Sequence, residues 1–250
     1  MRYPNAYRGV KKIFIALLIS FGLDILSMLI ILIINAVGVY DFYSGIPYKI
    51  FDFASIFALY LFYILMLLGV LEAGRDERIF RSACVPLCIR LGLYFIYNSL
   101  SLVTSYVFHN LISNLAMTWF SMIYRILAPL LSVWIWLSII DGCIALANEL
   151  EARGLVRFGS VLRWLLPIPC VLSLISSFIL ILQVMNSNLL QSLYETVDHM
   201  RIYRWQEILS RCASVLNLLM DVLLLICLGC TLRLLRNQAP EIKPETEIAP

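Results

Sequence analysis

Charged residues and histidines are scarce in this sequence of 250 residues. Asp, Glu, Lys and Arg make up 14% of the chain and there are two histidines, whereas a soluble domain usually has about 25% charged residues. Hydrophobic residues make up 62%. So few polar side chains cannot cover a water-exposed surface, which argues against a soluble globular domain.

Catalytic and metal-binding patterns are also lacking. The sequence contains no H-E-x-x-H pair, no G-x-S-x-G nucleophile elbow and no Walker-type phosphate loop. The seven cysteines are an odd number and lie mostly in apolar stretches, which argues against a disulfide framework. Cys227-x-x-Cys230 has no second pair or histidine to complete a metal site. We therefore predict neither an enzyme nor a protein with a bound metal or cofactor.

Long apolar segments are present instead, and six of them are near or above the roughly 20 residues that a helix needs to cross a bilayer. They lie near residues 13–36, 51–71, 83–107, 118–147, 166–186 and 212–235. Strands of a membrane barrel would be shorter, about 9–11 residues, and would alternate in polarity. The sequence therefore predicts an all-α fold: a polytopic six-helix bundle over residues 1–237, with a disordered tail over residues 238–250.

Lysine and arginine are distributed unevenly between the two sides of this predicted bundle. One side holds Arg2, Arg8, Lys11, Lys12, Arg75, Arg78, Arg81, Arg153, Arg157, Arg163, Arg233, Arg236 and Lys243, and the other holds Lys49, Arg125, Arg201, Arg204 and Arg211. The side that is richer in these residues faces the cytoplasm. The sequence thus predicts a multi-pass protein of the cell membrane with both termini in the cytoplasm.

Similar segments follow the second and fourth spans, namely Glu72-Ala73-Gly74-Arg75 and Glu151-Ala152-Arg153-Gly154. This similarity suggests three helical hairpins in a parallel repeat, although any cytoplasmic connection tends to be rich in Arg and Gly. Two further segments have amphipathic patterns. Residues 155–166 are predicted to form an elbow before the fifth span, and residues 187–210 are predicted to include an interfacial helix on the outer leaflet.

Polar residues recur on one face of several spans, where contact with lipid would be unfavourable. The set that we take as a candidate substrate or ion site is Ser20, Asp24, Ser27, Asn98, Asn217 and Asp221. Such faces are expected to point toward one another, either as a hydrogen-bonded core or around a hydrophilic cavity.

Four of the charged residues within the spans are of particular interest. Arg90 and Asp141 are both within about two turns of the cytoplasmic end of successive helices, and we predict that they form a structural ion pair. Asp24 and Asp221 lie deeper and have no basic partner at their own depth. A carboxylic acid in such a place is either a proton, cation or cationic-solute site, or is hydrogen-bonded and structural.

These features favour a non-enzymatic membrane protein that binds or conducts a small solute through the polar centre of the bundle. The alternative is a membrane-embedded component of a multi-subunit assembly, such as the substrate-binding subunit of a transporter that lacks its own ATPase. The expected partners are the lipid bilayer, an unidentified small-molecule ligand and, in the alternative, another membrane protein. Nucleic acid is not expected, because the basic residues lie at the membrane boundaries.

Overall fold

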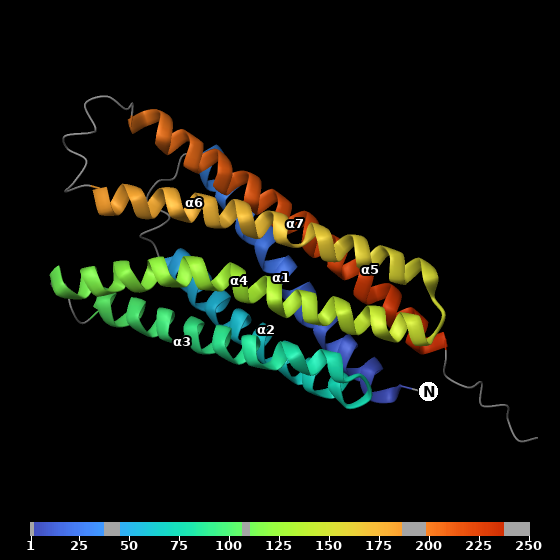
Figure 1. Cartoon of the computed structure of the whole chain (residues 1–250). Helices are drawn as coiled ribbons and strands as arrows, with labels where there is room; N and C mark the ends of the chain where they lie inside the picture. The colour runs from blue at the N-terminus through green and yellow to red at the C-terminus, as the bar shows by residue number, and fades with distance from the viewer. Residues whose placement is uncertain (1–2, 38–45, 107–110, 187–198, 238–250) are drawn as a thin grey trace, which may run out of the picture.

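The computed structural model describes residues 3–37, 46–106, 111–186 and 199–237, and these are almost entirely helical (Figure 1). The elements in chain order are α1 (Pro4–Val37), α2 (Ile46–Asp76), the short 3₁₀ helix η2 (Arg78–Ala83), α3 (Cys84–Tyr106), α4 (Leu111–Glu149), α5 (Arg153–Leu165), α6 (Pro167–Asn186) and α7 (His199–Asn237). Within these described ranges, six helical stretches are long and apolar enough to cross a membrane. The predicted all-α six-helix membrane bundle is confirmed.

Each predicted span lies largely or wholly within one helix, but several helices extend further than predicted. Helix α1 begins at Pro4, where a missing N–H is harmless, and the Asp76 carboxylate accepts the Ala6 N–H at 2.8 Å. Helix α5 confirms the predicted elbow and ends just before Pro167. Of the predicted interfacial segment, residues 187–198 lie outside the described ranges, as do residues 238–250 of the predicted tail.

The described part of that interfacial segment was predicted wrongly. Residues 199–210 form the first three turns of α7 and continue directly into the sixth span. No glycine or proline occurs between His199 and Leu228, so nothing in the local sequence interrupts the helix where residues 199–210 join the sixth span.

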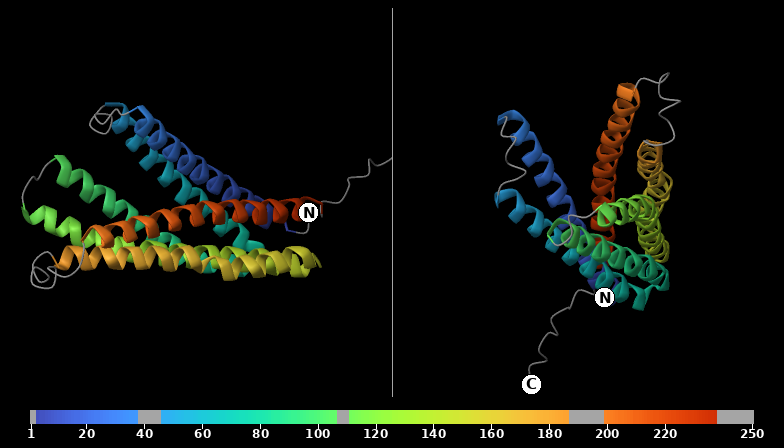
Figure 2. Two further views of the ribbon diagram at one scale, coloured as in Figure 1. Left: turned by 90° about the horizontal axis from the view of Figure 1, so that it is seen from above. Right: turned by 90° about the vertical axis from the view of Figure 1, so that its left-hand side faces the viewer.

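Sequential helices pack as antiparallel hairpins, with α1 beside α2, α3 beside α4, and α6 beside α7 (Figures 1 and 2). The first hairpin is the tightest, because small residues let the two backbones approach closely. A Cβ atom on Gly9 would lie 2.4 Å from both the Ala73 nitrogen and the Gly69 oxygen. The three hairpins are therefore present, while their origin as a sequence repeat stays a prediction.

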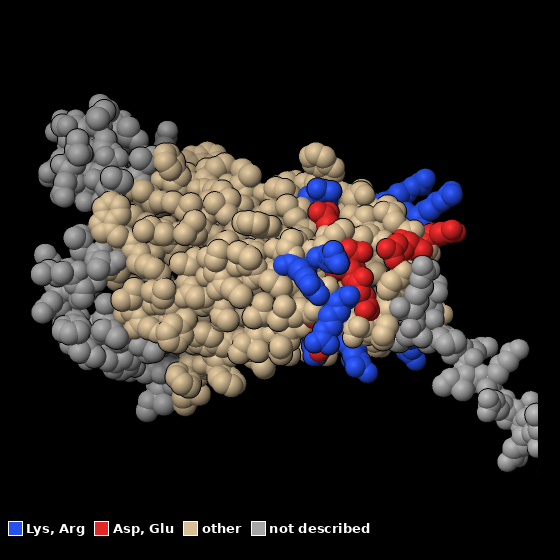
Figure 3. Space-filling model, turned by 60° about the horizontal axis from the view of Figure 1, so that its bottom comes forward, with Lys and Arg blue, Asp and Glu red and all other residues tan. Residues whose placement is uncertain are grey.

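Both ends of the described chain lie at the same end of the bundle, where α1 begins and α7 ends (Figure 1). On the face shown in Figure 3, the Lys, Arg, Asp and Glu side chains gather at this end, which we call the charged end. Polar contacts join the helices there. Lys12 pairs with Glu72, Asn5 donates to Asp76 at 2.8 Å, and the Tyr3 hydroxyl donates to Glu149.

The helices converge toward the charged end and diverge toward the opposite end (Figure 2), which we call the open end. Burial follows the same gradient. On α1 no described side chain beyond Leu17 is buried, and on α2 the first buried side chain is Tyr63. The hydrophobic core therefore fills the charged half of the bundle and thins out toward the open end.

Candidate binding cavity

A cavity of about 420 Å³ lies where the packed and divergent halves meet, and all six spans contribute to its wall. Pockets for small molecules usually have volumes of about 300–1,000 Å³. The cavity therefore has the size of a small-molecule site, although most of the surrounding bundle is apolar.

Each span contributes one buried apolar residue to the side of the cavity that faces the charged end. These six residues, which we call the apolar floor, are Leu17, Met66, Leu87, Ile135, Leu166 and Leu224. None is more than 5% exposed. Further buried residues such as Ile13, Val70 and Ile139 continue the packing toward the charged end. The cavity is thus closed on this side by tightly packed side chains.

Two carboxyl groups lie above the floor on the neighbouring helices α1 and α7. Asp24 is two turns from Leu17, Asp221 is one turn from Leu224, and both line the cavity. Asp24 is exposed and Asp221 is half-buried. Neither has a hydrogen-bond or ion-pair partner among the residues that the structure describes.

The cavity brings together four of the six residues predicted as a substrate or ion site. Ser20 and Asn217 line it one turn from Asp24 and Asp221 on the same helices, as their spacing of four residues predicts. Two predicted residues are not part of its wall. Asn98 is buried, and its side-chain amide donates to the Tyr94 carbonyl one turn earlier on the same helix, at 2.8 Å. Ser27 lies further toward the open end, where α1 diverges from the bundle.

The predicted ion pair between Arg90 and Asp141 is wrong, because the structure gives each side chain another partner. Arg90 lines the cavity from α3. Its Nε donates to the Tyr63 hydroxyl at 2.6 Å, and its Nη1 donates to the Ala128 carbonyl and the Ser132 hydroxyl. The guanidinium carbon also lies 5.8 Å from the centre of the Tyr63 ring.

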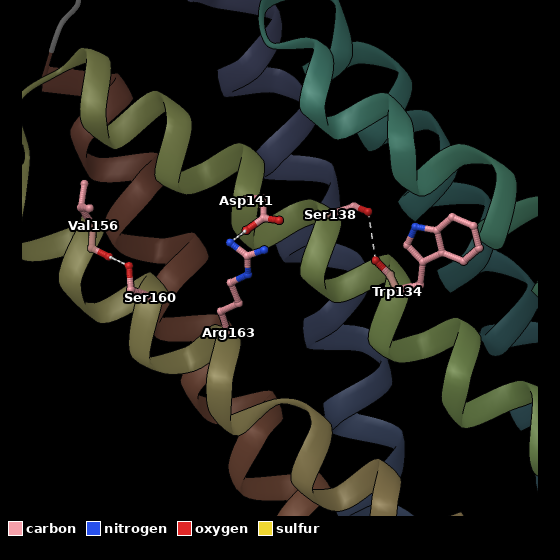
Figure 4. A network of polar contacts seen from close by, with 6 residues as sticks. All are labelled: Trp134, Ser138, Asp141, Val156, Ser160 and Arg163. Carbon is pink, nitrogen blue, oxygen red and sulfur yellow. Dashed lines mark hydrogen bonds and ion pairs between the residues drawn. The ribbon is translucent and has the colours of Figure 1, made fainter.

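Asp141 pairs instead with Arg163 of α5, with 3.3 Å between Oδ1 and Nη1 (Figure 4). The reason is depth. Ser132, which Arg90 contacts, precedes Asp141 by nine residues, or about 13 Å along a helix. Arg90 and Asp141 therefore lie at different levels of the bundle, and the amphipathic elbow supplies a nearer cation for Asp141.

Sequence reasoning missed the neutral polar residues that α2 and α4 contribute to the cavity. Tyr63, Tyr124 and Ser132 line the cavity from α2 and α4, and the Tyr124 ring stacks on Tyr97 with 4.8 Å between ring centres. Their only signal in the sequence is a hydroxyl group deep within an apolar span. That signal does not show which helices face each other.

Neither a metal-binding cluster nor a similarity to known proteins assigns a role to the cavity. In the parts of the chain that the structure describes, no group of three or more His, Cys, Asp or Glu side chains is arranged to hold a metal ion. No protein-family model matches the chain, and the searches of curated proteins and of solved structures found no match either.

Proposed function

We propose that this protein binds a small polar solute in the central cavity, taking it up from the open end, as a non-enzymatic multi-pass protein of the cell membrane. The observation that carries the proposal is the pair of carboxyl groups, Asp24 and Asp221, which share this cavity without a described partner. Ionisable residues within membrane spans are unfavourable and usually mark pathways for substrates, ions or protons.

A ligand would supply what the protein itself does not. Polar groups in an apolar environment are normally hydrogen-bonded, and charges are normally paired. Ser20 and Asn217 add a hydroxyl and an amide beside the two acids. A solute with a cationic group, together with water, would satisfy these four side chains at once.

The proposed direction of access follows from the two ends of the bundle. The apolar floor separates the cavity from the charged end, whereas the helices diverge toward the open end (Figure 2). The excess of Lys and Arg at the charged end favours a cytoplasmic orientation for that end. The cavity would then face the exterior, and release to the cytoplasm would require the six floor side chains to separate.

Ligand-induced thermal stabilisation of the purified chain tests the proposal. A panel of small amines, amino acids, carboxylates and monovalent cations would be added while unfolding is followed. A ligand that binds only the folded state at about 100 times its Kd stabilises that state by about 2.7 kcal/mol. We expect at least one cationic class to raise the Tm of the parent by several degrees, and the Asp24→Asn, Asp221→Asn double variant to lose that rise.

Asp141→Asn is the matched control, because Asp141 is also within a span but is paired with Arg163 outside the cavity wall. This control should keep the ligand-induced rise in Tm even if its baseline Tm falls. The proposal is wrong if no class shifts the parent, or if the shift survives in the double variant.

A further inference from the structure

The cavity carries charges of both signs on different walls. Asp24 and Asp221 come from α1 and α7, whereas Arg90 comes from α3. No ion pair joins Arg90 to either acid among the described residues. Opposite charges in one apolar site would normally be expected to pair, so the geometry here keeps them apart.

Arg90 is held on its wall by neutral acceptors. Tyr63, the Ala128 carbonyl and Ser132 accept from its Nε and Nη1 atoms. These three contacts tie the guanidinium to α2 and α4 rather than to the acids of α1 and α7. No carboxylate among the described residues forms an ion pair with it, so its positive charge remains available inside the cavity.

The guanidinium also keeps donors for a ligand. An arginine has five N–H donors, and the bonds to Tyr63, Ala128 and Ser132 account for Nε and Nη1 alone. The Nη2 group makes no hydrogen bond to the part of the chain that the structure describes. Guanidinium N–H groups bind carboxylate oxygens well because both are planar and fully charged.

We infer that the ligand of this cavity is a small amphoteric molecule that carries an ammonium group for the Asp24 and Asp221 wall and a carboxylate for the Arg90 wall. This inference rests on the proposed function and specifies its ligand class. A simple cation or a diamine would satisfy the acids but would leave the Arg90 charge without a partner. A dicarboxylate would face the two acids with like charge. An amino carboxylate is complementary to both walls.

Three probes of equal chain length test this inference: γ-aminobutyrate, putrescine and succinate, with glycine and lysine as shorter and longer amino carboxylates. Their affinities are measured by thermal unfolding of the full-length chain. The parent should bind at least one amino carboxylate about tenfold or more tightly than putrescine, and should bind succinate least well, because an uncompensated charge in a desolvated site is unfavourable.

The Arg90→Gln variant separates the two walls. It should lose the preference for amino carboxylates while retaining the binding of putrescine. Arg163→Gln is the control, because it removes an arginine that pairs with Asp141 outside the cavity wall, so the preference should remain. Arg90→Lys should keep part of the preference and serves as the second variant if Arg90→Gln does not fold.

The outcomes distinguish this inference from the proposed function. One contrary result is that the parent binds putrescine as tightly as every amino carboxylate, with a ratio of affinities that Arg90→Gln or Arg90→Lys leaves unchanged. That result would overturn the amphoteric ligand and leave a cation site in place. Preferential binding of succinate would also overturn it. If none of the probes and none of the wider panel binds the parent, the proposed function itself fails.

Discussion

The two halves of this bundle are both rich in apolar residues but differ in packing. In the charged half, every span contributes buried apolar residues, and polar contacts such as Asn5–Asp76 join the helix ends. In the open half, large apolar side chains such as Leu29 and Leu32 are 49% and 63% exposed. Apolar sequence alone therefore does not decide which part of a membrane helix packs against protein and which part faces outward. In the part of the chain that the structure describes, small residues and polar contacts hold the helices together at the charged end.

Truncation on α1 should give the largest difference between the two halves. Leu17 is 1% exposed in the floor, whereas Leu29 on the same helix is 49% exposed. Leu17→Ala should destabilise the protein by about 2–5 kcal/mol, because a core truncation leaves a cavity. Leu29→Ala should change stability by less than about 0.5 kcal/mol. Denaturant titration of both variants in the same detergent measures the difference, and equal losses would remove the distinction between the halves.

The α1–α2 crossing should be nearly as sensitive to added volume. The Cβ atom of Gly9→Ala would meet backbone atoms at 2.4 Å, and overpacking of this kind typically costs about 1–3 kcal/mol. Gly22 on the same helix has nothing within 4 Å of the corresponding position. Gly22→Ala should be neutral or slightly stabilising, because alanine favours the helix. Thermal unfolding of the pair tests this, and a stable Gly9→Ala variant would show that the helices cross less closely.

Loss of the ion pair between Arg163 and Asp141 should change stability the least. Arg163 and Asp141 side chains are 57% and 30% exposed, and such partly exposed pairs contribute about 0–1 kcal/mol. In a double-mutant cycle, Arg163→Gln and Asp141→Asn should therefore couple weakly but measurably. Arg90→Leu and Asp141→Asn should be additive to within about 0.5 kcal/mol, because the two residues share no partner. A larger coupling between Arg90 and Asp141 would restore the partnership that their sequence positions suggest.

The sequence predicted the features that depend on one helix at a time. Run length identifies the six spans, and the four-residue spacing of Ser20 with Asp24 and of Asn217 with Asp221 places each pair on one face. Partners between helices were harder to predict, because they depend on relative depth. Arg90 contacts Ser132, more than two turns before Asp141 on α4, while α5 brings Arg163 to Asp141. The Tyr63 and Ser132 anchors were missed for the same reason.

Thiol accessibility from each side of the membrane tests the central claim, a cavity open at one end and closed by the floor. Ser20→Cys lies in the cavity wall, whereas Ala16→Cys lies one turn nearer the charged end, where Ala16 is 0% exposed. A membrane-impermeant thiol reagent would be added to right-side-out and inverted vesicles. Labelling would be mapped by peptide mass, because the chain has seven native cysteines. The account predicts that Ser20→Cys reacts only from the exterior and that Ala16→Cys reacts from neither side. Reaction of Ser20→Cys from the cytoplasmic side, or its failure to react from the exterior, would contradict the account.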